Sequence, residues 1–264
     1  MFYGKLIGGV LGLLVLGPLG LLIGLFVGHL FDKGLWQTLR FASPENIARI
    51  KQSFFESTFL LSGYMAKADG HISQQEIDHT EMVISQMGLS AEQRKRAIEL
   101  FREGSAANFQ PEPAISRFLE ATGGQQQLKQ TLLFFQISLA MADQALDDAE
   151  RDALNRIATL LGFTRAQLEQ MLRMAQAQGH FHGHGGAAGP EPGTTLEDAY
   201  EALGVSKDVD DKSLKRAYRK LMSENHPDKL IAQGVPEDMV KMATEKSQDI
   251  QAAYEMIKKS RGMK

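Results

Sequence analysis

A stretch without charged residues near the start constrains this chain of 264 residues more than any other feature. No Asp, Glu, Lys or Arg occurs between Lys5 and Asp32. As one helix, residues 6–31 would be about 39 Å long, which exceeds the roughly 30 Å of a bilayer's hydrocarbon core. A cleavable signal peptide fits less well, because the apolar run is too long and no Ala-x-Ala-like site follows His29. The sequence therefore predicts a retained, single-pass transmembrane helix over residues 6–31.

The charges that flank this helix predict its orientation. Only Lys5 precedes it, whereas four basic residues follow it: Lys33, Arg40, Arg49 and Lys51. Basic residues gather on the cytoplasmic side of membrane proteins. We therefore expect the bulk of the chain to be cytoplasmic and residues 1–5 to lie on the other side.

Glycines within the span recur every four residues. The two sets are Gly4, Gly8 and Gly12, then Gly20, Gly24 and Gly28. This spacing places small residues on one helix face, where two backbones can approach closely, although glycine is also common in membrane helices in general. We expect two copies of the chain to associate through Gly20, Gly24 and Gly28. Pro18, between the sets, is expected to kink or break the helix.

Overall composition excludes several classes of chemistry. The chain has no cysteine, which excludes disulfides, thiolate-bound zinc and a thiol nucleophile. Its net charge of -3 gives no global attraction to nucleic acid.

Residues 43–178 show a helical pattern with an internal repeat at an offset of 74 positions. The matching pairs are Ala68-Asp69 with Ala142-Asp143, Ile72 with Leu146, Glu76 with Glu150, Gly88 with Gly162, Ser90 with Thr164, and Gln93 with Gln167. Capping boxes are expected at Ser73/Glu76, Ser90/Gln93, Asp147/Glu150 and Thr164/Gln167. The pattern predicts two three-helix units around a pseudo-twofold axis.

The acidic turns of the two copies are weak candidates for a cation site through Asp69 and Asp143. Neither turn has the ligand spacing of an EF-hand loop, and helix capping already explains the acidic residues at Glu76 and Glu150. The turns resemble those of TerB-like domains, in which a similar Asp-Gly-x-Ile-x-x-x-Glu stretch occurs in each half; the second copy departs from it at Gln144. The resemblance implies an all-helical interaction domain without enzyme chemistry.

Residues 179–194 are rich in glycine and histidine and have little to bury. We expect a flexible linker that lets the last seventy residues move independently. His180, His182 and His184 alternate in a pattern that can hold a transition metal, but a linker that happens to contain histidines is the simpler interpretation.

The C-terminal region predicts a short helix over 196–203, a second over 211–225 and a third over 236–259. The second helix carries a basic face made of Lys212, Lys215, Arg216, Arg219 and Lys220. A loop is expected from the end of this helix through Gly234, with His226 and Asp228 on an exposed turn at its start. The apolar stripe of the third helix, Val240, Ala243, Ile250, Tyr254 and Ile257, is expected to pack antiparallel on the second.

Residues 198–205, 214–221 and 226–229 resemble a J-domain in residue type, order and spacing, and the resemblance covers residues 195–264. One departure is Ser247, where members usually have a phenylalanine packed between helices. The resemblance implies that a DnaK-type chaperone is the partner and that this domain needs no catalytic group or cofactor. The residues implied in chaperone binding are His226, Pro227, Asp228, Lys215, Arg216, Arg219 and Lys220. A nucleic-acid partner for the basic helix finds no further support in the sequence.

The whole architecture resembles the DjlA family: an all-α chain with a membrane anchor, a TerB-like middle domain, a Gly-rich linker and a terminal J-domain. That family implies a location in the bacterial inner membrane, a periplasmic N-terminus, stimulation of ATP hydrolysis by the chaperone, and a link to envelope-stress signalling. A dimeric membrane scaffold or sensor, acting mainly through the TerB-like domain, is the second hypothesis.

Overall fold

The computed structural model describes residues 3–41, 43–68, 70, 89–141, 146–181 and 194–263. Two compact units make up the chain, Met1–Ala48 and Arg49–Lys264. Within the described ranges every regular element is a helix, so the predicted all-α class is confirmed there. In chain order the elements are α1 (Tyr3–Phe41), α2 (Pro44–Ala66), α4 (Ala91–Gly104), α5 (Pro111–Thr122), α6 (Gln126–Ala140), α7 (Asp148–Leu160), α8 (Arg165–Gly179), α9 (Leu196–Ala202), α10 (Asp211–Glu224), α11 (Pro227–Gln233), η1 (Glu237–Met239) and α12 (Val240–Ser260).

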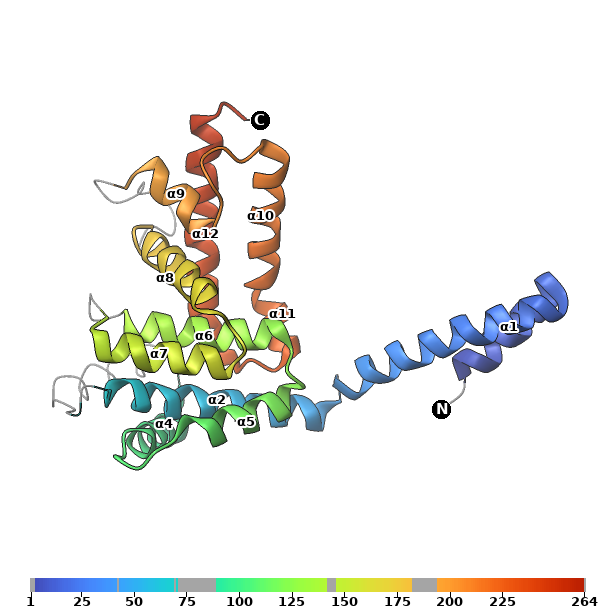
Figure 1. Ribbon diagram of the computed structural model, residues 1–264, viewed down its shortest axis with the longest axis horizontal. Helices are drawn as coiled ribbons and strands as arrows, with labels where there is room; N and C mark the ends of the chain where they lie inside the picture. Colours follow the sequence, from blue (N-terminus) through green and yellow to red (C-terminus); the bar gives the residue numbers. More distant parts are fainter. Residues whose placement is uncertain are drawn as a thin grey trace. The chain divides into compact units, whose positions relative to one another are not determined.

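Helix α1 is broken at Gly17, which has φ 63° and ψ −148°. This backbone conformation is open to glycine alone, and Pro18 disfavours helical geometry at the residue before it. The break that Pro18 predicts is therefore confirmed. Its consequence was not expected, because α1 doubles back on itself (Figure 1). A methyl group at Gly12 would overlap the carbonyl oxygen of Gly20 and lie 3.2 Å from the Cα of Gly24.

The glycine face that was predicted to pair two chains thus contacts the N-terminal part of its own chain. Gly20 and Gly28 are buried in this arrangement. Pairing of two chains through Gly20, Gly24 and Gly28 would replace the contact with Gly12, and this association remains a prediction. Among the helices of the described residues, none combines the length and the apolar character needed to cross a membrane.

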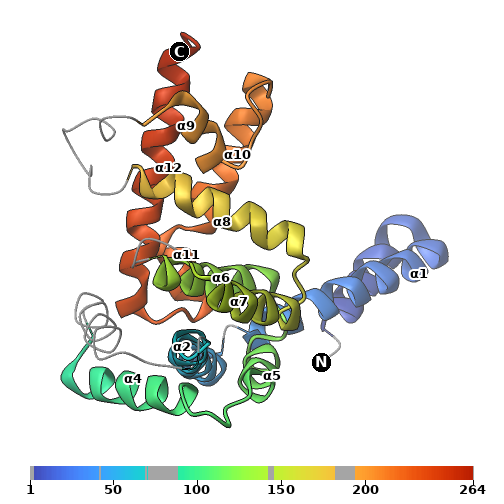
Figure 2. The ribbon, with the colours of Figure 1, turned by 60° about the vertical axis from the view of Figure 1, so that its left-hand side comes forward.

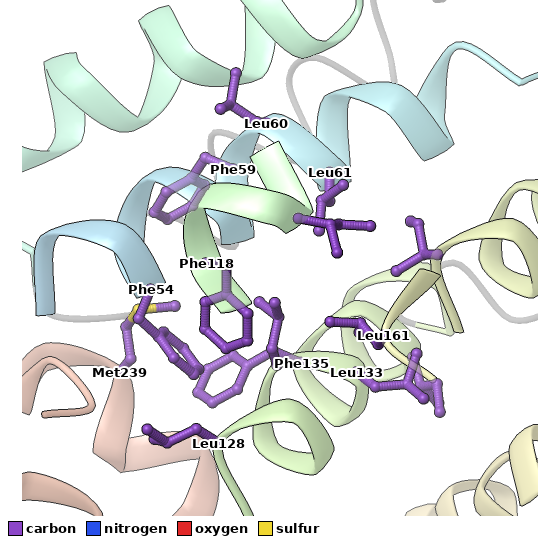
Figure 3. Close-up of a cluster of buried hydrophobic side chains, with 14 of the residues drawn as sticks. Phe54, Phe59, Leu60, Leu61, Phe118, Leu128, Leu133, Phe135, Leu161 and Met239 are labelled. Carbon is purple, nitrogen blue, oxygen red and sulfur yellow. The ribbon is translucent and has the colours of Figure 1, made fainter. Parts of the chain in front are cut away.

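Among the described residues the middle domain consists of α2 and α4–α8 (Figure 2), and its centre is aromatic. Phe54 of α2 makes edge-to-face contacts with Phe118 and Phe135, with ring centroids 5.9 and 5.7 Å apart. All three rings are buried and converge in Figure 3. Burial of aromatic side chains of this size dominates the energetics of a small helical core.

The capping boxes were predicted correctly wherever the structure describes them, whereas the helix expected to begin at Pro236 begins at Val240, after the 3-10 turn η1. Capping boxes occur at Ser90/Gln93, Asp147/Glu150 and Thr164/Gln167, and the pair Ser73/Glu76 lies outside the described residues. Each box satisfies two backbone N–H groups at a helix start.

The C-terminal domain is built on an antiparallel hairpin of α10 and α12, with α9 against α12 (Figures 1 and 2). The rings of Tyr218 and Tyr254 stack across the hairpin at 4.1 Å between centroids and 11° between planes. Leu214, Ile250 and Ile257 are fully buried in the same cluster. This packing matches the hairpin expected from the apolar faces of the two helices.

The expected linker begins later than the sequence suggested. Gly179 is still part of α8, and Phe181 is buried at 2% exposure among the residues of the C-terminal domain. The amide of Gln178 donates from Nε2 to the carbonyl oxygen of Ala202, 2.8 Å away. Residues 182–193, which include His182 and His184, lie outside the described residues.

The middle and C-terminal domains share one hydrophobic core. The C-terminal residues Leu230, Val235, Met239, Val240 and Ala243 are buried in the same cluster as Phe54 and Leu128. Figure 3 shows Met239 beside Phe54. The apolar stripe of α12 is therefore divided: its first turn enters the middle domain, and only Ile250, Tyr254 and Ile257 pack within the hairpin. An independently moving C-terminal domain does not fit this packing.

A cleft of about 320 Å³ lies between α6 and α8 of the middle domain and α10 and α12 of the C-terminal domain. Lys246 of α12 lines it, with its Nζ 3.1 Å from the ring centroid of Phe134 on α6. Burial lowers the pKa of Lys246 to about 7, against the opposing attraction of Glu224 and Asp249. The ring contact partly offsets the loss of water around the ammonium group.

Met239→Ala tests the shared core. We expect a loss of about 2–4 kcal/mol in the free energy of unfolding, because a fully buried side chain is truncated between two domains. Urea unfolding of residues 43–264, followed by circular dichroism, would measure it, with Met222→Ala in the C-terminal domain's own cluster as the control. Separate unfolding of an undisturbed C-terminal domain in the wild-type chain would contradict the shared core.

Lys246→Met tests the electrostatic consequence of the cleft. Because the folded-state pKa is depressed, the unfolded chain binds more protons between pH 7 and about 10.5, so this group makes stability rise with pH across that window. The substitution should stabilise the protein by about 1–2 kcal/mol at pH 7 and remove that part of the rise. Denaturant midpoints at pH 7 and pH 9.5 give the measurement, and Lys241→Met, at an exposed position, should leave the pH dependence unchanged.

Candidate functional site

The candidate site begins with the basic face of α10. The side chain of Asp210 caps this helix by accepting bonds from the backbone N–H groups of Lys212 and Ser213, both at 2.9 Å. Bonds from Ser213, first of all, lower the pKa of the Asp210 carboxyl, so the cap remains a carboxylate near neutral pH. The helix is thereby fixed at the end opposite the His-Pro-Asp triplet.

Most of the predicted basic residues of α10 are exposed to solvent. Arg216, Arg219 and Lys220 are exposed, and Lys215 is half-buried. Lys220 also lines the cleft beside α6 and α8, with its Nζ 3.9 Å from a carboxylate oxygen of Glu224. The stacked Tyr218 and buried Leu214 hold the other side of α10 against α12.

The triplet begins a helix where a loop was predicted. His226 is the N-cap of α11, and its Nδ1 accepts a bond from the backbone N–H of Asp228 at 3.2 Å. Pro227 occupies the first helical position, where its missing N–H costs nothing. The helix ends at Gly234, whose φ of 95° suits glycine. Pro227 and Gly234 were the sequence signal for this short helix, and the prediction overlooked it.

Asp228 is the most exposed part of the triplet, at 88% for its side chain, and His226 is exposed at 57%. In the part of the chain that the structure describes, the basic atom recorded near the Asp228 carboxylate is Nδ1 of His226, 4.0 Å away. An exposed carboxylate with so weak an ionic partner is available to a cation on another molecule.

Two side chains contact the backbone just before the triplet, and neither contact was predicted from the sequence. Ser247 Oγ lies 2.9 Å from the carbonyl oxygen of Ala243 and 3.2 Å from that of Asn225, and its one proton is shared between these two acceptors. Gln127, from α6 of the middle domain, donates to the carbonyl oxygen of Glu224 at 2.9 Å. Ser247 stands where J-domains usually have a phenylalanine, and its hydroxyl connects α12 to the residue before His226.

Of the candidate metal ligands, the structure describes only His180. Asp69, Asp143, His182 and His184 lie outside the described residues. His180 instead faces Asp198, with Nδ1 3.4 Å from Oδ1. Hydrogen bonds from Thr195 chiefly lower the pKa of Asp198, and His180 adds to the effect. The described ranges contain no group of three His, Cys, Asp or Glu residues that could hold a metal ion.

Comparison with known proteins matches three consecutive families to the chain. Residues 1–38 match the co-chaperone DjlA transmembrane domain, residues 56–181 the tellurite resistance protein TerB, and residues 198–262 the DnaJ domain. No solved structure matches the chain.

Relatives match the chain over nearly its full length. Co-chaperone protein DjlA of Vibrio cholerae is 41% identical over 281 residues, covering 99% of both chains. The protein of the same name from Coxiella burnetii is 40% identical and covers 98% of both, and that from Yersinia pestis is 39% identical, covering 100% of this chain and 99% of its own. With these relatives and the order of its three domains, the chain belongs to the DjlA family of bacterial, membrane-anchored co-chaperones.

Proposed function

We propose that the chain stimulates ATP hydrolysis by a DnaK-type chaperone at the cytoplasmic face of the bacterial inner membrane. The observation that carries this proposal is the exposed carboxylate of Asp228, which lies in the first turn of α11, just beyond the end of the basic helix α10. The match of residues 198–262 to the DnaJ domain supports it. So does the name co-chaperone that the relatives carry.

The basic face and the triplet have different tasks in this mechanism. Arg216, Arg219 and Lys220 attract an acidic surface of the chaperone, which raises the rate and the specificity of the encounter. Asp228 then makes a charge-assisted hydrogen bond to an arginine of the chaperone. Because J-domain binding favours the hydrolysing state, it shifts the chaperone's population toward that state. The co-chaperone therefore supplies no catalytic group and no cofactor.

The anchor and the middle domain determine where this event happens. We place residues 1–5 in the periplasm and the domains after α1 in the cytoplasm, on the basis of the flanking charges. The middle domain is a duplicated unit that recruits a partner, with envelope-stress signalling as the process it serves. The hydrogen bond between Ser62 and Gln136, 3.3 Å long and joining residues 74 positions apart, supports a pseudo-twofold relation of α2 and α6.

A dimeric scaffold or sensor is the second candidate function. It is favoured by the glycine face of α1, where the backbone of Gly20 approaches so closely that a side chain at Gly12 has no room. Such a face can pair two anchors as well as two halves of one anchor. In that case the middle domain would be the active part and would place the chaperone beside its client.

His226→Gln tests the first function. The substitution removes the ring nitrogen that caps α11, and we expect roughly a tenfold or larger loss in stimulation. Single-turnover ATP hydrolysis by a DnaK-type chaperone, with the full chain in detergent micelles, provides the measurement. The same substitution at His180, the C-cap of α8 beside Asp198, serves as the control. Stimulation by His226→Gln equal to that of the wild type would exclude the proposed function.

Gly24→Leu tests the dimeric anchor. A leucine on this face prevents close backbone approach, so we expect the fraction of dimer in detergent to fall by about tenfold. Crosslinking across a dilution series would measure that fraction, and Val27→Leu, on an exposed position of α1, should leave it unchanged. A wild-type chain that is monomeric throughout the series would contradict the scaffold hypothesis while leaving the chaperone stimulation of the first function intact.

A further inference from the structure

A single side chain of the middle domain contacts both ends of the segment that carries the triplet, from the end of α10 to the end of α11. Gln127 lies in the first turn of α6 and is half-buried. Its Nε2 donates to the carbonyl oxygen of Glu224, the last residue of α10, at 2.9 Å. Its Oε1 accepts from Nε2 of Gln233, the last residue of α11, at 3.0 Å. One amide group therefore contacts the chain just before His226 and again at the C-terminal end of α11.

Both contacts involve groups that need a partner. Glu224 lies at the C-terminal end of α10, where carbonyl groups lack a bonding partner within the helix. The Oε1 of Gln233 is buried without a hydrogen-bond partner among the described residues, so the bond from its Nε2 to Gln127 is the one that fixes this side chain. Leaving either group unpaired has a cost in free energy that favours the arrangement seen.

Apolar packing on the same side strengthens the hold of the middle domain on the loop. Leu230, at the centre of α11, is buried at 1% exposure in the shared core, together with Val235 just after Gly234. Ser247 fixes the carbonyl of Asn225 from within the J-domain. The segment 224–235 is thus held at both ends and in the middle, from one side.

The triplet lies on the opposite, open side of this segment. The side chains of His226 and Asp228 are exposed at 57% and 88%, while Leu230 is directed into the core. The contacts that hold the segment therefore do not cover the groups that a chaperone would meet, which excludes steric masking as their effect.

We infer that the TerB-like domain is a positioning element for the His226-Pro227-Asp228 triplet, and that Gln127 is the positioning residue. This inference rests on the proposed function, because the positioned triplet acts on the chaperone. Gln127 touches no chaperone group itself; it acts through the backbone of Glu224 and the side chain of Gln233. The middle domain thereby contributes to how well the J-domain binds the chaperone.

The physical effect is preorganisation. A loop that must become ordered on binding loses affinity by the entropy of that ordering, and a loop that is already ordered avoids the loss. Removing Gln127 should therefore weaken the apparent affinity for the chaperone, while the bound triplet still acts as before. Two neutral hydrogen bonds of this kind correspond to roughly a tenfold change in the concentration needed.

The experiment compares three variants of the full chain in detergent micelles. Gln127→Ala removes both bonds. Gln127→Glu keeps an acceptor for Gln233 and loses the donor to Glu224. Gln130→Ala is the matched control, because Gln130 also is half-buried and lines the same cleft. The rate of single-turnover ATP hydrolysis by a DnaK-type chaperone is measured over a range of co-chaperone concentrations.

We expect Gln127→Ala to raise the half-maximal concentration by roughly tenfold at unchanged maximal stimulation. Gln127→Glu should raise it at least as much, because its carboxylate replaces the donor and repels the carbonyl oxygen of Glu224 at the C-terminal end of α10, and Gln130→Ala should match the wild type. Amide hydrogen exchange at Lys229 and Leu230, whose N–H groups bond to the carbonyl oxygen of His226, should accelerate in Gln127→Ala. A structural defect alone would also raise the half-maximal concentration, by lowering the fraction of folded protein, so the helical circular dichroism of Gln127→Ala must equal that of the wild type for the inference to hold.

The outcomes separate this inference from the function on which it rests. If Gln127→Ala and Gln130→Ala share the wild-type half-maximal concentration while His226→Gln is inactive, the positioning role is overturned and the chaperone function stands. If the wild-type chain itself gives no stimulation, the proposed function fails. Unchanged exchange at Lys229 and Leu230 in Gln127→Ala would likewise overturn the inference.

Discussion

The insertion of the segment after α11 into the core of the middle domain is the interaction on which the arrangement of the middle and C-terminal domains depends. Met239, Val240 and Ala243 belong to the C-terminal domain, and they are buried in one cluster with Phe54 of the middle domain. Burial of apolar area at this junction is worth about 25 cal/mol for each Å² removed from water. The polar contacts around it, such as those of Gln127 and Lys246, can form because this packing brings α6 and α12 together.

Because of this shared core, the J-domain depends on the middle domain for part of its own packing. An isolated hairpin of α10 and α12 would keep the Tyr218–Tyr254 stack and Leu214, but it would lose the burial of Leu230. The triplet lies between these two regions, one stabilised within the J-domain and one stabilised by the middle domain. Its local order is therefore a property of both domains, and the residues that determine it are spread over about a hundred positions of the sequence.

The sequence predicted those features that local chemistry decides. The capping boxes at Ser90, Asp147 and Thr164 follow from side chains three residues apart, and the hairpin follows from the apolar spacing on two helices. Pro18 predicted the break in α1. In each of these cases the residues that decide the structure are close together in the chain, so their pattern is sufficient.

The features that were missed depend on contacts between distant segments. Val240 and Ala243 continue the same helical stripe as Ile250, and spacing alone cannot tell that the first two face another domain. Nothing in the surroundings of Gln127 marks it as a partner of Glu224, which is 97 positions away. The fold-back of α1 likewise depends on Gly12 meeting Gly20, whereas the four-residue spacing of glycines is equally suited to two chains. Only α11 had a local signal, in Pro227 and Gly234, that could have revealed it.

Ser247 connects these observations. Members of the J-domain family usually have a phenylalanine here that packs between the helices, and this chain has a hydroxyl that bonds to the carbonyl of Asn225 instead. Exchanging an aromatic ring for a serine removes apolar packing near the base of the hairpin, next to the triplet. The missing stabilisation has to come from elsewhere if the loop is to stay ordered. Burial of Leu230 against the middle domain and the two hydrogen bonds of Gln127 supply this stabilisation. A smaller J-domain core and a docked TerB-like domain therefore complement each other, and we expect the segment that carries the triplet to be best ordered when both domains are in place.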